Sequence, residues 1–176
     1  MTKILIIDDE VDIANNISAI LTDENYEAYK ASNSDQAFNL MSLNKFDLII
    51  LDVWLDNSKL DGLEILKEIR KKESLPIIVI SGHGNIEMAV QAIKDGANEF
   101  IEKPFTSERL VLSVNRSIEM SIIKNENINL KTKNIYNYKF IGTSTQIMKT
   151  KQLIKKIAPT SSRVMIYGES GTGKDI

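Results

Sequence analysis

The sequence has 176 residues, of which 43% are hydrophobic and 26% charged, a composition that can form an ordinary globular core. Its 22 Lys and Arg against 24 Asp and Glu leave a net charge of −2, which excludes nucleic-acid binding through bulk positive charge. The absence of Cys and the single His exclude disulfides, cysteine-ligated zinc and multi-histidine metal sites. With no long apolar run and no signal-peptide pattern, we expect a soluble cytoplasmic protein without membrane contact.

Strand-like and helix-like patterns alternate along the first two thirds of the chain. Apolar runs predict strands at residues 4–7, 26–31, 48–51, 77–80 and 100–101. Helical spacing of apolar residues predicts helices over 11–22, from 34, over 62–72, over 86–94, and from 107 towards 128. We expect Ser34 to cap the second helix and Gly96 to end the fourth. Five strands, each followed by a helix, predict a doubly wound α/β domain with a parallel sheet over residues 1–125.

The remainder of the chain has a different composition. Residues 126–140 are rich in Asn and Lys and are predicted to be a linker, with a frayed helix end followed by irregular chain. Residues 141–176 then begin a second unit, with a predicted helix over 144–157 and a predicted strand over 164–167.

A glycine-rich segment follows that predicted strand and fits the phosphate-binding pattern G-x-x-x-x-G-K. Its expected phosphate-binding residues are Gly168, Gly171, Gly173 and Lys174. Asp175 stands where the pattern has Ser or Thr, and no helix follows. We therefore expect this to be a truncated ATPase segment that is inactive in this chain.

Polar residues follow several predicted strands, where parallel strands present a common edge for ligands. They are Asp8, Asp9, Asp52, Ser81 and Lys103. Three carboxylates in one pocket repel each other, so a divalent cation is expected, and an oxygen-only site suits Mg²⁺. Lys103 and Ser81 could contact a phosphoryl group carried by one of the acids. Asp52, the lone acid on a central strand, is the expected acceptor, whereas Asp8-Asp9 has the spacing of a metal clamp.

This combination resembles the receiver domains of two-component response regulators. The residues that carry the resemblance are Asp8-Asp9, Asp52, Asp61-Gly62, Ser81-Gly82 and Lys103-Pro104. It implies a CheY-like, flavodoxin-like fold with strand order 2-1-3-4-5 and a long C-terminal helix. It also implies Asp52 as phosphoacceptor, and Mg²⁺ bound by Asp8, Asp9, Asp52 and the backbone carbonyl of Trp54. Ser81 and Phe100 would be the switch residues, and Lys103 would contact the phosphoryl group beside a cis Pro104.

Two further segments resemble a particular branch of this family. Residues 53–55, 60–63 and 81–87 resemble the NtrX branch of NtrC-type regulators, and residues 141–144 and 168–175 resemble the start of their AAA+ sigma-factor-interaction ATPase domain. The branch implies an NtrY-like sensor histidine kinase as partner, a homodimer through the fourth helix, fifth strand and fifth helix, and ATP only in a full-length form. Asp56 departs from the family, which commonly has Pro four residues after the acceptor.

Two other functions stay open for this site. An aspartyl-phosphate phosphatase could use the same kind of sheet, but such enzymes often place a general acid two residues after the nucleophile, where this chain has Trp54. We expect at most slow self-dephosphorylation. A phosphorylation-independent interaction module is the third interpretation, and the presence of all expected site residues argues against it.

Overall fold

The computed structural model describes residues 1–56, 58–82, 86–137, 142–161 and 163–169, without the side chains of residues 125 and 127–137. The chain divides into two compact units, Met1–Asn125 and Glu126–Ile176, which are described separately. The predicted domain boundaries at residues 125 and 140 stay predictions. Among the described residues, no helix has the length and apolarity that crossing a membrane requires.

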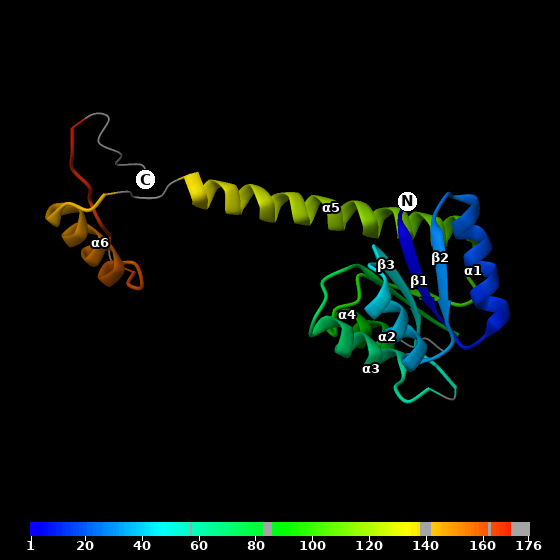
Figure 1. The fold of residues 1–176 in the computed structure, drawn as a ribbon. Coiled ribbons are helices and arrows are strands. Elements are labelled where there is room, and N and C mark those ends of the chain that lie inside the picture. The colour runs from blue at the N-terminus through cyan, green and yellow to red at the C-terminus, as the bar shows by residue number, and fades with distance from the viewer. Residues whose placement is uncertain (57, 83–85, 138–141, 162, 170–176) are drawn as a thin grey trace. The chain divides into compact units, whose positions relative to one another are not determined.

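The first unit is built on a parallel five-stranded sheet (Figure 1). Its strands are β1 (Lys3–Ile7), β2 (Glu27–Ala31), β3 (Leu48–Asp52), β4 (Ile77–Ser81) and β5 (Glu99–Glu102). Their order, β2-β1-β3-β4-β5, confirms the predicted fold. Both β3 and β4 are buried along their whole length, because helices cover both sheet faces, and this explains their unbroken apolar runs.

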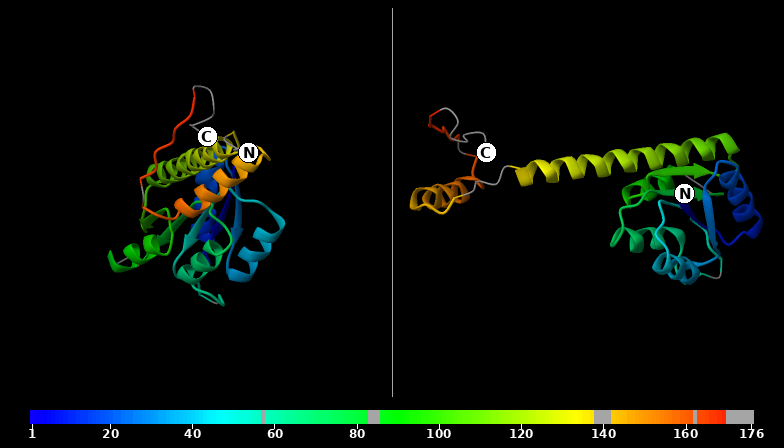
Figure 2. Two further views of the ribbon diagram at one scale, coloured as in Figure 1. Left: turned by 90° about the vertical axis from the view of Figure 1, so that its left-hand side faces the viewer. Right: turned by 45° about the horizontal axis from the view of Figure 1, so that its top comes forward.

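Helices pack on both faces of that sheet (Figures 1 and 2). They are α1 (Val11–Asp23), α2 (Ser34–Leu43), α3 (Gly62–Arg70), α4 (Ile86–Lys94) and α5 (Ser107–Asn137). Side chains of α1 and α5, including Ile17 and Leu110, pack on one face of the sheet. Side chains of α2, α3 and α4, including Ala37, Leu66 and Ala92, pack on the other. Right-handed crossovers produce this division into two layers.

The connection from β3 to α3 is fixed by local interactions. Asp61 caps α3 and forms a reciprocal capping box with Glu64. The N–H of Gly62 donates to the carbonyl of Val53 at 2.9 Å, and a Cβ on Gly62 would lie 2.0 Å from the carbonyl oxygen of Asp52. Only glycine fits there, so the Asp61-Gly62 pair holds the start of α3 directly against the end of β3.

Two predictions about helix ends are tested by the structure. Gly96 follows α4 with φ of 104°, which confirms that it ends this helix. The expected cap of α2 is wrong by one residue: Asn33 is the cap, and its side chain accepts from the N–H of Gln36. Ser34 is instead the first helical residue and is buried, with its N–H donating to the Ser58 hydroxyl at 3.0 Å.

After residue 107, the length of one helix and the predicted strand at 164–167 differ from the sequence expectation. Helix α5 continues to Asn137, because the stretch from Ser107 has neither Gly nor Pro to interrupt its hydrogen bonds. Helix α6 (Thr145–Ile157) begins as predicted, with Ser144 as its cap. The predicted strand at 164–167 is wrong: these residues are exposed and form no strand, since no strand in the described part of the chain pairs with them.

Candidate functional site

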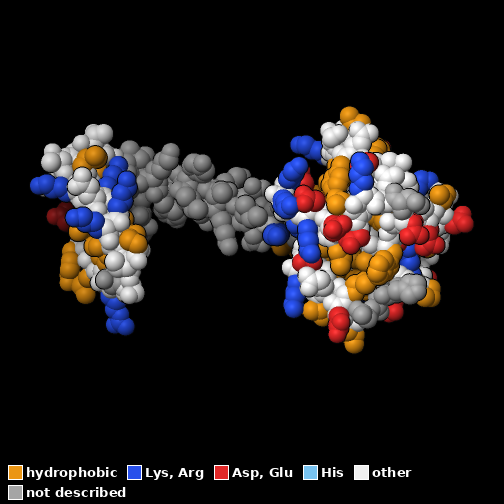
Figure 3. All heavy atoms as spheres, turned by 90° about the horizontal axis from the view of Figure 1, so that it is seen from below, with side chains coloured by type: hydrophobic (Ala, Val, Ile, Leu, Met, Phe, Trp, Pro, Cys, Tyr) orange, Lys and Arg blue, Asp and Glu red, His pale blue; other side chains and the backbone are white. Residues whose placement is uncertain are grey.

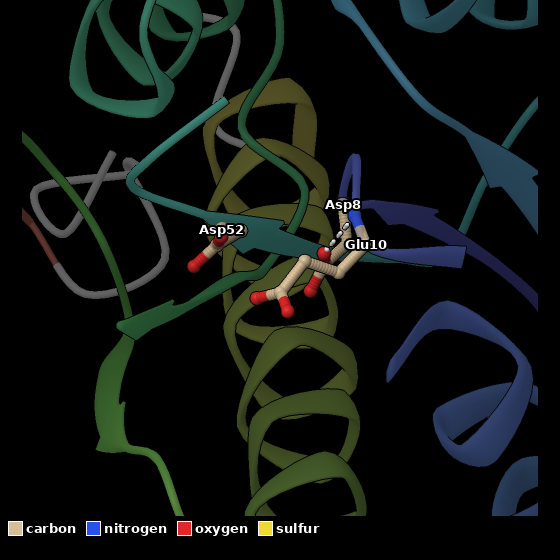
Figure 4. Close-up of side chains that lie close together, drawn as sticks. All are labelled: Asp8, Glu10 and Asp52. Carbon is tan, nitrogen blue, oxygen red and sulfur yellow. Dashed lines mark hydrogen bonds between the residues drawn. The ribbon is translucent and has the colours of Figure 1, made fainter. Parts of the chain in front are cut away.

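Three carboxylates meet at the carboxyl end of the central strands (Figure 4). Asp8 and Glu10 lie just after β1, and Asp52 is the last residue of β3. One carboxylate oxygen from each lies within 4.8 Å of the others. The N–H of Glu10 donates to Asp8 Oδ1 at 2.9 Å, which fixes the turn that follows β1. This is an oxygen-only donor set of the kind that binds a hard divalent cation.

Lys103, from the loop after β5, supplies a positive charge to these acids. Its Nζ lies 2.9 Å from Asp8 Oδ2, 3.4 Å from Asp52 Oδ2 and 3.7 Å from Glu10 Oε1. Burial alone lowers the pKa of Lys103, but the carboxylates of Asp8 and Asp52 outweigh burial and raise it. The peptide bond between Lys103 and Pro104 is cis, as expected. Among the described residues, one cation thus faces three carboxylates, so the site has an excess of negative charge.

The carboxyl group of Asp52 is the most strongly perturbed acid of the site. Its side chain is only 4% exposed. Burial raises the pKa of Asp52 to about 6, with Asp8 adding to the rise and Lys103 opposing it. Within the described part of the structure, Oδ1 of Asp52 is buried without a hydrogen-bond partner. An unpartnered carboxylate oxygen beside two more acids fits a metal ion or a reacting phosphorus atom.

Asp9 and Trp54 were predicted to complete the magnesium site. Among the described residues Asp9 is not part of the three-acid cluster: its Oδ2 accepts from the N–H of Asp56 at 3.1 Å and thereby holds the loop after β3, and its role as a metal ligand stays a prediction. Glu10 was missed by the sequence reasoning, although it is the third acid of the run that begins at Asp8. The side chain of Trp54 is exposed in the loop after β3, and the role of its carbonyl stays a prediction.

The two expected switch residues lie on neighbouring strands. Ser81 ends β4 and is completely buried, and its hydroxyl donates to Sδ of Met88 in α4 at 3.8 Å. Phe100 in β5 is half-buried against the core. It also lines a hollow of about 350 Å³ together with Ile93 and Met120, between α4 and α5. Met88 also packs, partly buried, against the core.

The glycine-rich segment is almost entirely outside the described residues. Gly171, Gly173 and Lys174 lie outside the described residues, so the predicted phosphate-binding loop stays a prediction. Gly168 is described and exposed, outside any helix or strand. The site that the structure describes is therefore the one at the carboxyl edge of the sheet.

Comparison with known proteins agrees with this site and this fold. The family described as "Response regulator receiver domain" matches residues 4–115, and "Sigma-54 interaction domain" matches residues 140–176. An NtrX-like response regulator of Rickettsia bellii is 48% identical over 177 residues, covering 100% of this chain and 37% of the relative. The chain therefore spans little more than a third of that relative's length.

Two solved structures are similar to the first unit. The crystal structure of the receiver domain of NtrX from Brucella abortus is 49% identical, with a TM-score of 0.64, covering 66% of this chain and 98% of that one. The solution structure of the beryllofluoride-activated NtrC4 receiver domain dimer is 38% identical, with a TM-score of 0.64, covering 68% and 98% respectively.

The parallel sheet with its acidic edge defines a response regulator receiver, and the chain belongs to that family. Its relatives identify the branch. The receiver is NtrX-like, within the NtrC family, and the start of a sigma-54 interaction domain follows it.

Proposed function

We propose that Asp52 accepts a phosphoryl group from a sensor histidine kinase in the presence of Mg²⁺. The observation that carries this proposal is the buried, unpartnered Oδ1 of Asp52, at a sheet edge that also holds Asp8, Glu10 and Lys103. With its pKa near 6, Asp52 is mostly ionised at neutral pH and can act as a nucleophile. Membership of the receiver family supports a kinase as the donor.

In the proposed reaction, a carboxylate oxygen of Asp52 forms a bond to phosphorus while the bond from phosphorus to the donor's histidine nitrogen breaks. Asp8 and Asp52, with Glu10 or Asp9, would hold Mg²⁺, which when bound offsets the negative charge of the acids and the phosphoryl oxygens. Asp9 holds the N–H of Asp56 through Oδ2, so it would join either through its other carboxylate oxygen or by leaving that N–H. Lys103 already lies beside Asp52 and would pair with a phosphoryl oxygen.

The proposed output is a change in pairing between two receivers. Ser81 would turn towards the phosphoryl group, and Phe100 would follow it inward. The face formed by α4, β5 and α5 exposes apolar side chains, among them Val90, Ile93 and Met120, which a second copy could cover. The dimeric state of the related beryllofluoride-activated receiver supports this output.

The proposal concerns the receiver unit alone. The face shown in Figure 3 carries both acidic and basic side chains on this unit. ATP binding and DNA contact would belong to a longer form of the protein, with the length of its relatives.

Beryllofluoride, which imitates a bound phosphoryl group, tests the proposal. Trp54 is the one tryptophan of the chain, is 54% exposed and lies two residues from Asp52, so its fluorescence reports the site. We expect a saturable fluorescence change that needs Mg²⁺ and is lost in Asp52→Ala. Sedimentation of the same samples should show a change in association.

Other outcomes of that experiment identify the competing functions. Continued release of phosphate from many equivalents of acetyl phosphate would indicate a phosphatase. A wild-type protein without any response dependent on Asp52 would indicate a phosphorylation-independent interaction module. Asp56→Ala is the matched control, since Asp56 is an exposed acid of the neighbouring loop, and it should respond like the wild type.

A further inference from the structure

Helix α4 is attached to the core by few side chains. Ala92 is buried, and Met88 packs against the core while half-exposed. The larger apolar side chains Ile86, Val90 and Ile93 are exposed. A helix with so little buried apolar surface is an element whose position a weak interaction can influence.

The hydroxyl of Ser81 contacts this helix through sulfur. Ser81 Oγ donates to Met88 Sδ at 3.8 Å, and Ser81 itself is completely buried at the end of β4. A thioether is a weak acceptor, so this hydrogen bond holds the hydroxyl less strongly than a carbonyl would. An incoming phosphoryl oxygen is a charged acceptor and would form a stronger hydrogen bond with the same hydroxyl.

We propose that Met88 is a positioning residue of the receiver switch, which retains the Ser81 hydroxyl in the resting state and links its departure to the first turn of α4. The inference rests on the proposed function of Asp52. When Ser81 turns to a phosphoryl group, the hydrogen bond from its hydroxyl to Met88 is lost, and the first turn of α4 loses this contact with β4. The acceptor strength at position 88 therefore contributes to how readily the receiver is activated.

Two substitutions at this position should have opposite effects on activation. Met88→Leu keeps the apolar volume and removes the acceptor, so beryllofluoride should bind roughly threefold more tightly at fixed Mg²⁺. Met88→Gln keeps the chain length and supplies a stronger carbonyl acceptor, so beryllofluoride should bind more weakly than to the wild type. Trp54 fluorescence measures both affinities, and urea unfolding verifies that each variant is folded.

Controls separate this role from simple packing. Met41→Leu changes a methionine of α2 that packs against the same core cluster, and its beryllofluoride affinity should equal that of the wild type. In a Ser81→Ala background, Met88→Leu and Met88→Gln should no longer alter the beryllofluoride affinity, because the hydroxyl that donates to position 88 is absent.

The possible failures are distinguishable. If the wild type responds through Asp52 but both Met88 variants shift the affinity in the same direction, or keep their effects without the Ser81 hydroxyl, the role of Met88 is overturned and the proposed function stands. If the wild type shows no response dependent on Asp52, the proposed function falls and the role of Met88 falls with it.

Discussion

Replacing Asp52 with Asn should make the receiver more stable at neutral pH while removing its ability to accept a phosphoryl group. The folded protein holds a buried, ionised carboxylate whose pKa is raised to about 6, whereas the same group in the unfolded chain ionises near its ordinary value. Removing that charge should raise the free energy of unfolding by about 2 kcal/mol without Mg²⁺. Urea unfolding followed by Trp54 fluorescence measures the change.

The sign of this effect depends on pH in a defined way. Because the pKa is higher in the folded state, the folded protein binds a proton more readily, and the penalty of ionised Asp52 disappears as pH falls from above 6 towards 4. The gain from Asp52→Asn should therefore be largest above pH 6 and small near pH 4. Asp56→Asn, at an exposed acid, should change little. A gain that is constant across this range, or a loss at neutral pH, would contradict the charge explanation.

Replacing Lys103 with Met should have the opposite effect on stability. Met keeps an apolar stem in place of the lysine chain but removes the one cation within 4 Å of Asp8, Asp52 and Glu10 among the described residues. Unpaired buried carboxylates are costly, so the free energy of unfolding should fall by about 3 kcal/mol without Mg²⁺. Saturating Mg²⁺ should restore much of it, because the ion supplies the missing charge.

A second lysine provides the control for that experiment. Lys67 pairs with Asp95 at 3.3 Å, and its side chain is about half exposed. Lys67→Met should lower the free energy of unfolding by less than about 1 kcal/mol, with no dependence on Mg²⁺. An equal loss for Lys103→Met with and without Mg²⁺ would mean that Lys103 acts through the packing of its stem rather than through its charge.

Most of the first unit could be predicted from the pattern of apolar residues, which indicates the buried strands and the buried faces of helices. The short apolar run from Leu48 to Leu51 predicts a strand covered on both faces, which the structure confirms, and an acid ends that strand at the site. The cap of α2 could not be chosen in this way, because Asn33 and Ser34 are both good capping residues and the backbone angles decide between them. The strand expected at 164–167 failed because an apolar pattern does not supply a hydrogen-bonding partner.

The site shows a similar limit of sequence reasoning. Topology alone brings Asp8, Asp52 and Lys103 together, and all three predicted positions meet at one edge. Which neighbour of Asp8 joins them depends on the turn after β1, which directs Glu10 to the cluster and Asp9 to the loop after β3. The contact of Ser81 with Met88 could not be foreseen either, because a methionine at helical spacing predicts core packing.

Chemical mapping of the modified residue tests the central claim most directly. After incubation with acetyl phosphate and Mg²⁺, borohydride reduces an aspartyl phosphate to homoserine, and peptide mass spectrometry locates that residue. The account predicts homoserine at position 52 alone, and none when Mg²⁺ is withheld. Homoserine at Asp9 or Asp56, or no modification of a folded protein that binds Mg²⁺, would contradict it.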